Sequence, residues 1–149
     1  MDAGEFKALL GDVAKAHGFT AAHGGWYRET AAALFVLSLQ KSNFGNYFEL
    51  NIKLFLGHRL PSNASEFKKL VKSLSGDIFL RQPEDYREVF DMDGVITVAD
   101  RQDRLEKMFT ELVDRMVSAS DTPGGILRLR DEGVLYLLPM AEAHLKKTT

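Results

Sequence analysis

Two apolar stretches separated by a polar turn constrain the fold of this chain more than any other feature. Residues 33–42 and 47–56 are rich in leucine, phenylalanine, valine and isoleucine, and the turn between them reads Asn43-Phe44-Gly45-Asn46. Branched and aromatic side chains favour strands, whereas asparagine and glycine favour turns. The pattern therefore predicts a β-hairpin at the centre of the fold.

The order of polar and apolar side chains also predicts the register of this hairpin. A four-residue loop over 43–46 sets Ser42 opposite Tyr47, and it gathers one apolar face from Phe35, Leu37, Leu39, Phe48, Leu50, Ile52 and Leu54. The opposite face then carries Ser38, Gln40, Glu49, Asn51 and Lys53. A five-residue loop would bury charges among the apolar side chains at a cost of several kcal/mol each. We therefore expect the four-residue loop.

Apolar residues at helical spacing predict helices on both sides of the hairpin. The expected helices cover Phe6 to Val13 with an end at Gly18, Asn63 to Gly76, Asp100 to Ser118, Thr122 to Glu132, and a final helix from Pro139. Further strands are expected at 26–29, 77–81 and 86–92, and 134–138 fits a strand equally well. The expected fold is α+β, with an antiparallel meander of about five strands and helices packed on one face, in a single domain over 1–149.

The composition excludes several classes of function. The chain has 149 residues, no cysteine and a net charge of −2, so it can form neither disulfides nor thiolate zinc sites, and it lacks a strongly basic footprint for nucleic acid. His17, His23, His58 and His144 stand apart, so no metal site is predicted and no cofactor is expected. Without a secretory leader or a long apolar run, the expected location is cytoplasmic.

Several short motifs in the first third of the chain carry a family resemblance. Gly18-Phe19, Trp26-Tyr27-Arg28, Leu39-Gln40-Lys41-Ser42 and Phe48-Glu49-Leu50-Asn51-Ile52 follow one another in this order. In this arrangement, clearest over residues 17–57, the chain resembles the bacterial domain-of-unknown-function family 4304. The resemblance implies an α+β domain and supplies no catalytic residues.

Residues 89–96 offer an enzymatic alternative. Val89-Phe90-Asp91-Met92-Asp93-Gly94 is similar to the first motif of haloacid-dehalogenase-type phosphatases, in which the first aspartate attacks phosphorus, the second acts as acid and base, and Mg²⁺ is bound. Such enzymes need a parallel, doubly wound sheet, which the remaining chain does not predict. The other interpretation of Asp91 and Asp93 is a strand end with an Asp-Gly turn.

Six residues are the candidate binding residues. The polar face of the hairpin and its turn contribute Gln40, Lys41, Ser42 and Asn51, which could bind an anion or a peptide backbone, while Trp26 and Arg28 could stack on a base or an aromatic group. All six also fit ordinary core or solvent-exposed positions. The preferred hypothesis is a non-enzymatic protein-binding or adaptor module, with a role in defence or immunity among its options. A weak nucleic-acid binder built on Trp26, Arg28 and Lys41 is the further alternative.

A basic cluster on the predicted second helix and the strand after it also needs an interpretation. It consists of Lys68, Lys69, Lys72 and Arg81, with Glu66 and Asp77 nearby. Such a cluster could contact an acidic partner, although charges of both signs are also typical of a solvated face.

Overall fold

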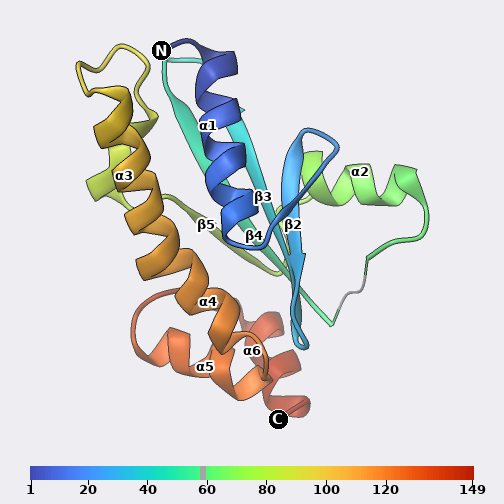
Figure 1. Ribbon diagram of the computed structural model, residues 1–149. Coiled ribbons are helices and arrows are strands. Elements are labelled where there is room, and N and C mark those ends of the chain that lie inside the picture. The colour runs from blue at the N-terminus through green and yellow to red at the C-terminus, as the bar shows by residue number, and fades with distance from the viewer. Residues whose placement is uncertain (58–59) are drawn as a thin grey trace.

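The computed structural model describes residues 1–57 and 60–149 and has an α+β fold (Figure 1). Its five-stranded antiparallel sheet has the order β1-β2-β3-β4-β5, so consecutive strands are neighbours, as a meander requires. The strands are β1 (Thr20–Ala22), β2 (Gly25–Glu29), β3 (Ala33–Lys41), β4 (Phe48–Leu56) and β5 (Ile78–Arg81). His58 and Arg59 lie outside the described residues.

The register of the central hairpin confirms the four-residue loop. Lys41 pairs with Phe48 and Ser38 with Asn51, and the backbone N–H of Ser42 donates to the carbonyl oxygen of Tyr47 at 2.9 Å. The apolar residues of both strands therefore point to one face. On this face Phe35, Leu37, Leu50, Ile52 and Leu54 are fully buried.

Five of the helices cover that apolar face. They are α1 (Ala3–Ala16), α3 (Val98–Met108), α4 (Asp114–Ala119), α5 (Pro123–Asp131) and α6 (Pro139–Lys147), and the π-helical turn η2 (Phe109–Val113) joins α3 to α4. All contribute buried apolar residues to the core beneath the sheet. The predicted helices are confirmed, and α5 begins after Thr122, whose hydroxyl accepts a hydrogen bond from the N–H of Gly125. No helix among the described residues is both long enough and apolar enough to cross a bilayer.

The remaining α-helix, α2 (Ala64–Lys72), packs on the opposite face, so the expectation of helices on one face alone is wrong for α2. Its Leu70 and Val71 form a second core with Leu34, Val36 and Phe55 of the hairpin. These three side chains of β3 and β4 point away from the main core, because successive residues of a strand face opposite sides of the sheet. Since they are apolar, this second face also needs a helix to cover it. Only part of the polar face therefore remains open.

Lys53 is buried beneath α2, where its ammonium group bonds to carbonyl oxygens at the C-terminal end of that helix. Its side chain is 4% exposed, and its ammonium donates to the carbonyl oxygens of Val71 at 2.8 Å and Leu70 at 3.4 Å. The last carbonyl oxygens of a helix lack intrahelical N–H donors, and at the end of α2 the ammonium group of Lys53 provides the missing donor. Burial lowers the pKa of Lys53.

Two strand predictions need correction. Residues 84–90 form the 3₁₀ helix η1 (Glu84–Phe90) and not a strand, because the chain turns after Pro83, where the N–H of Tyr86 donates to the Pro83 carbonyl. The fifth strand is instead β1, a short segment without a clear alternating pattern. Residues 134–138 form no strand in the described chain.

Candidate functional site

The edge of β3 is unpaired where β3 extends beyond the start of β2. Strand β2 begins at Gly25 and pairs with residues 34–37 of β3, whereas β3 continues to Lys41. Because Ser42 and Tyr47 form a bonded pair, bonded pairs alternate along the hairpin, and the N–H and C=O of Leu39 and Lys41 point away from β4. No described residue pairs with these groups. They form an open edge over Ser38–Lys41.

Three polar side chains lie on the sheet next to this open edge. The Nε of Arg81 donates to Asn51 Oδ1, its Nη2 donates to Gln40 Oε1, and Asn51 Nδ2 also donates to Gln40 Oε1, each at 3.3 Å. A guanidinium can only donate, so Arg81 fixes both amides with their oxygens toward it. The Nε2 group of Gln40 is left as a free donor among the described residues.

A cavity of about 410 Å³ connects the polar group to the open edge. Its lining includes Ser38, Gln40 and Asn51 from the hairpin, together with Lys7 of α1, His23 of the β1–β2 turn and Lys72 of α2. None of its lining residues is acidic. Lys7 and His23 could not be assigned to this site from the sequence, because they come from elements whose docking has no local signal.

Lys41 and Ser42 lie at the far end of the open edge and stabilise the hairpin turn. Lys41 Nζ donates to Asn46 Oδ1 at 2.5 Å and lies 5.1 Å from the centre of the Phe48 ring. Ser42 Oγ accepts a hydrogen bond from the N–H of Phe44 at 3.0 Å. Their side chains therefore hold the turn, while the backbone of Lys41 remains available.

Trp26 and Arg28 do not join this group. Trp26 is only 4% exposed and packs against Gly11 of α1, so its ring offers no open face for stacking. Arg28 donates from Nη1 to the carbonyl oxygen of His17 at 2.5 Å. Both side chains belong to the face covered by α1, opposite Gln40 and Asn51. The structure therefore separates the six candidate residues into two places.

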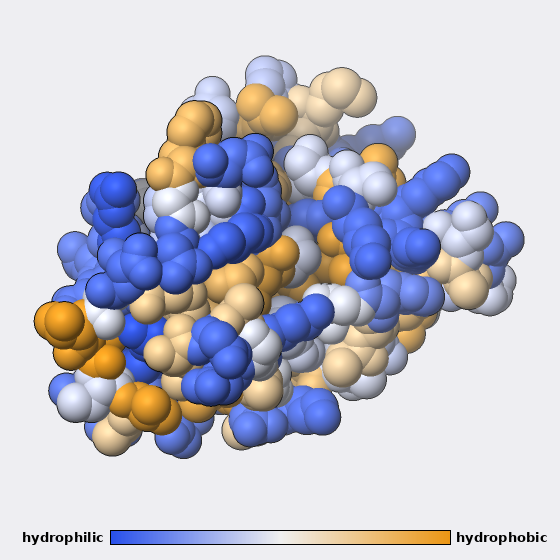
Figure 2. All heavy atoms as spheres, turned by 90° about the horizontal axis from the view of Figure 1, so that it is seen from above, coloured by the Kyte–Doolittle hydropathy of each residue, from blue (hydrophilic) through white to orange (hydrophobic). Residues whose placement is uncertain are grey.

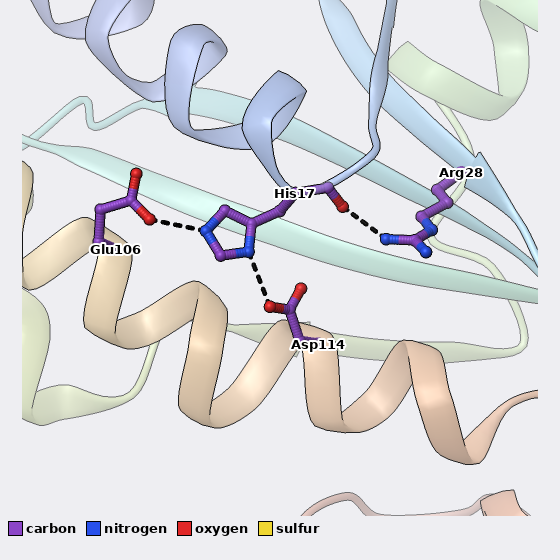
Figure 3. Close-up of polar contacts among 4 residues, drawn as sticks. All are labelled: His17, Arg28, Glu106 and Asp114. Carbon is purple, nitrogen blue, oxygen red and sulfur yellow. Dashed lines mark hydrogen bonds and ion pairs between the residues drawn. The ribbon is translucent and has the colours of Figure 1, made fainter.

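His17, the residue at the C-terminal end of α1, makes long-range contacts that the sequence did not predict (Figure 3). The ring joins α1 to the long helix, because Nε2 lies 2.7 Å from Glu106 and Nδ1 lies 2.7 Å from Asp114. Burial lowers the pKa of His17, but the hydrogen bonds to Glu106 and Asp114 raise it more, and the net pKa is above its ordinary value. With both nitrogens bonded, the ring has none free to accept a proton from a substrate, although a cavity of about 640 Å³ lies beside it.

Replacing His17 with glutamine should lower the free energy of unfolding by about 2 kcal/mol at pH 6, because two hydrogen bonds to charged groups are lost. In the native chain this stabilisation is complete below the pKa of the unfolded state and declines as the pH rises from about 6.5 through the raised pKa of the folded state. Urea unfolding across pH 6 to 9 measures the slope. His144→Gln is the control, since His144 forms no ion pair among the described residues. An unchanged slope in His17→Gln would contradict the assignment.

Asp91 and Asp93 serve the loop that contains them. Asp91 Oδ1 accepts a hydrogen bond from the N–H of Asp93 at 2.9 Å, and Asp93 Oδ1 accepts one from Asn46 Nδ2 at 2.9 Å. Asp91 follows η1 and makes one isolated bridge with Tyr47, while every strand pair in the described sheet is antiparallel. The phosphatase motif thus lacks the parallel strand end that its chemistry uses. The part of the chain described here contains no group of three or more metal-ligating side chains suited to a metal ion.

Comparison with protein families supplies one match. The family described as Domain of unknown function (DUF4304) matches residues 10–123, which is most of the chain. The chain belongs to this family. The DUF4304 match includes all five strands and the long helix with its π-helical turn, while residues 124–149, with α5 and α6, follow it. Comparisons with curated proteins and with solved structures found no match.

Proposed function

We propose that this domain binds a partner protein by adding an extended segment of the partner as a strand to the open edge of β3. The observation that supports this most directly is the unpaired backbone of Leu39 and Lys41. Each residue offers one N–H and one C=O in the plane of the sheet, which is the set of groups that an incoming strand pairs with. Gln40 and Lys41 are exposed, so the edge is accessible.

The other side of the hairpin supports the proposal by contrast. Strand β5 is also shorter than β4 and pairs only with Asn51 to Leu54, so both ends of β4 extend beyond it. Side chains bond to the backbone at each of these ends. The N–H of Leu50 donates to Gln82 Oε1 at 2.7 Å, and the N–H of Leu56 donates to Asp77 Oδ2 at 2.8 Å. Native sheets normally cover or block free edges, since these invite pairing with other chains. Side chains therefore close the ends of β4 that extend beyond β5, whereas the end of β3 that extends beyond β2 is open.

The surroundings of the open edge limit how a partner strand can lie. The β1–β2 turn, with His23 and Gly24, stands at the lower end of the edge and lines the same cavity as Leu39. An added strand therefore lies end to end with β2 and continues its line along β3. Figure 2 looks down on the end of the molecule that carries the N-terminus, where hydrophilic side chains are mixed with apolar ones, as is typical of non-obligate interfaces.

Replacing Lys41 with proline tests the backbone contact. Proline removes the N–H that points outward but leaves the bonded pairs of β3 and β4 intact, and Lys41→Ala removes the same side chain while keeping the N–H. Peptides selected from a random display library on the native protein should bind the proline variant about tenfold more weakly, corresponding to about 1.4 kcal/mol, and the alanine variant nearly normally. Fluorescence anisotropy measures the affinities, and circular dichroism verifies folding.

Amide exchange provides a second readout of the same contact. Bound peptide should slow exchange at the amides of Leu39 and Lys41, which alternate with amides already bonded to β4. Failure to select any binding peptide, or equal binding to the proline and alanine variants without protection of these two amides, would overturn the proposal.

A further inference from the structure

We propose that the segment bound at this edge carries an acidic side chain, whose carboxylate is received in the cavity between Lys7, His23 and Lys72. This inference rests on the proposed function and adds the chemical class of the partner segment. The charge and the hydrogen-bonding groups of the cavity lining support it.

Two lysines converge at one point of the cavity. Lys7 Nζ lies 3.6 Å, and Lys72 Cε 3.9 Å, from the position that a Cβ atom would take at Gly24. Lys7 comes from α1 on one face of the sheet and Lys72 from α2 on the other, and neither forms an ion pair among the described residues. Two lysine side chains without an ion-pair partner in the described structure thus lie beside the turn at the lower end of the open edge.

The neutral groups of the cavity add donors. Arg81 and Asn51 occupy the oxygen of Gln40, so that its Nε2 group remains to donate to a ligand. Ser38 contributes a hydroxyl, which can also donate. His23 is held in place by an edge-on ring contact with Phe67 of α2 at 5.2 Å.

The cavity lining contains no acidic residue, which indicates that the cavity suits a negatively charged ligand. The chain as a whole has 21 acidic and 19 basic residues, yet the lining contains two lysines and no carboxylate. A carboxylate is an acceptor with two oxygens and accepts from ammonium, amide and hydroxyl groups together. Because the cavity lies beside Leu39, a glutamate or aspartate of the added strand can reach the lysines while the backbone of that strand pairs with β3.

Two matched peptides test the inference. One is an acetylated and amidated peptide of alternating valine and threonine with a central glutamate, and the other carries glutamine at that position, so neither has a free terminal carboxylate. Calorimetry on the native chain should give about threefold to tenfold tighter binding of the glutamate peptide at low salt, and this preference should shrink as salt is raised.

Charge reversal locates the preference. The double variant Lys7→Glu, Lys72→Glu should lose it, whereas Lys68→Glu, Lys69→Glu should retain it, since these residues make the same change in net charge outside the cavity. Equal affinities of the two peptides on the native chain, with the Leu39 and Lys41 amides protected, would overturn the acidic preference and leave strand addition standing. A preference that survives in the Lys7 and Lys72 variant would also overturn it. Absence of protection with either peptide would overturn strand addition itself.

Discussion

Replacing Gly125 with alanine should destabilise the protein by about 3 kcal/mol or more, because the added methyl group has no space. A Cβ atom there would stand 1.9 Å from the carbonyl oxygen and 2.8 Å from the carbonyl carbon of Ala119. The obstacle is the backbone at the end of α4, so no side-chain rotation can relieve the overlap. Helix α5 would have to move away from α4, with loss of the packing around Ile126, which is fully buried. Chemical denaturation measures the loss.

The neighbouring glycine is the matched control for this substitution. A Cβ atom at Gly124 would have only Arg128 Nη1 nearby, at 3.9 Å. Alanine at this helical position should leave the fold intact and stabilise it by about 0.5–1 kcal/mol, since the unfolded chain loses freedom. Opposite signs at two adjacent glycines would show that the close approach of α5 to α4 is real. Similar values for both variants would contradict it.

Replacing Phe109 with alanine should lower the free energy of unfolding by about 3–5 kcal/mol. Phe109 is fully buried at the start of the π-helical turn, and its ring centre lies 5.3 Å from that of His17 and 6.1 Å from that of Phe19. Its loss leaves a cavity where α1, the sheet and the long helix meet. Thermal and urea unfolding at pH 6, where His17 is protonated, measure the effect.

Phe44 provides the same chemical change without burial. It is 95% exposed at the tip of the β3–β4 turn, so Phe44→Ala should alter the free energy of unfolding by less than about 0.5 kcal/mol. The difference between the two variants isolates the contribution of burial. A cost for Phe109→Ala close to that of Phe44→Ala would show that the core of the folded protein is arranged otherwise.

The central hairpin could be predicted from sequence because one local property decides it. Shifting the pairing by one residue would exchange the faces of every side chain, and only the four-residue loop keeps Glu49 and Lys53 away from Leu37. Helix ends were also predictable where a cap defines them, as at Asn63 and Thr122, since capping depends on residues within one turn.

Other parts of the fold depend on contacts that no local pattern contains. Residues 86–92 have a strand-like composition, yet the turn after Pro83 forms η1. The position of α2 on the second face depends on its contacts with Leu34, Val36 and Phe55, and no local pattern shows which helix covers these apolar residues. The contacts of His17 are also long-range, since Glu106 and Asp114 lie 89 and 97 positions after it in the sequence.

The candidate site was predictable to the extent that the hairpin register brings its residues together. Opposite pairing of Ser38 with Asn51 places Gln40 close to Asn51, as expected. Arg81 was recognised only as part of a basic cluster, although its pairing with Asn51 across β4 and β5 makes it the residue that orients both amides. Lys7 enters the site only through the docking of α1.

The wide turn at Phe109–Val113 also sets the rotational phase of the helix that contains it. Glu106 and Asp114 are eight positions apart, and at about 100° per residue a uniform α-helix would place them about 80° apart around its axis. A π turn takes in one extra residue, so Asp114 assumes the angular position of a seventh residue, about 20° from Glu106. One imidazole ring can therefore lie between two carboxylates that a helix of constant pitch would direct to different sides.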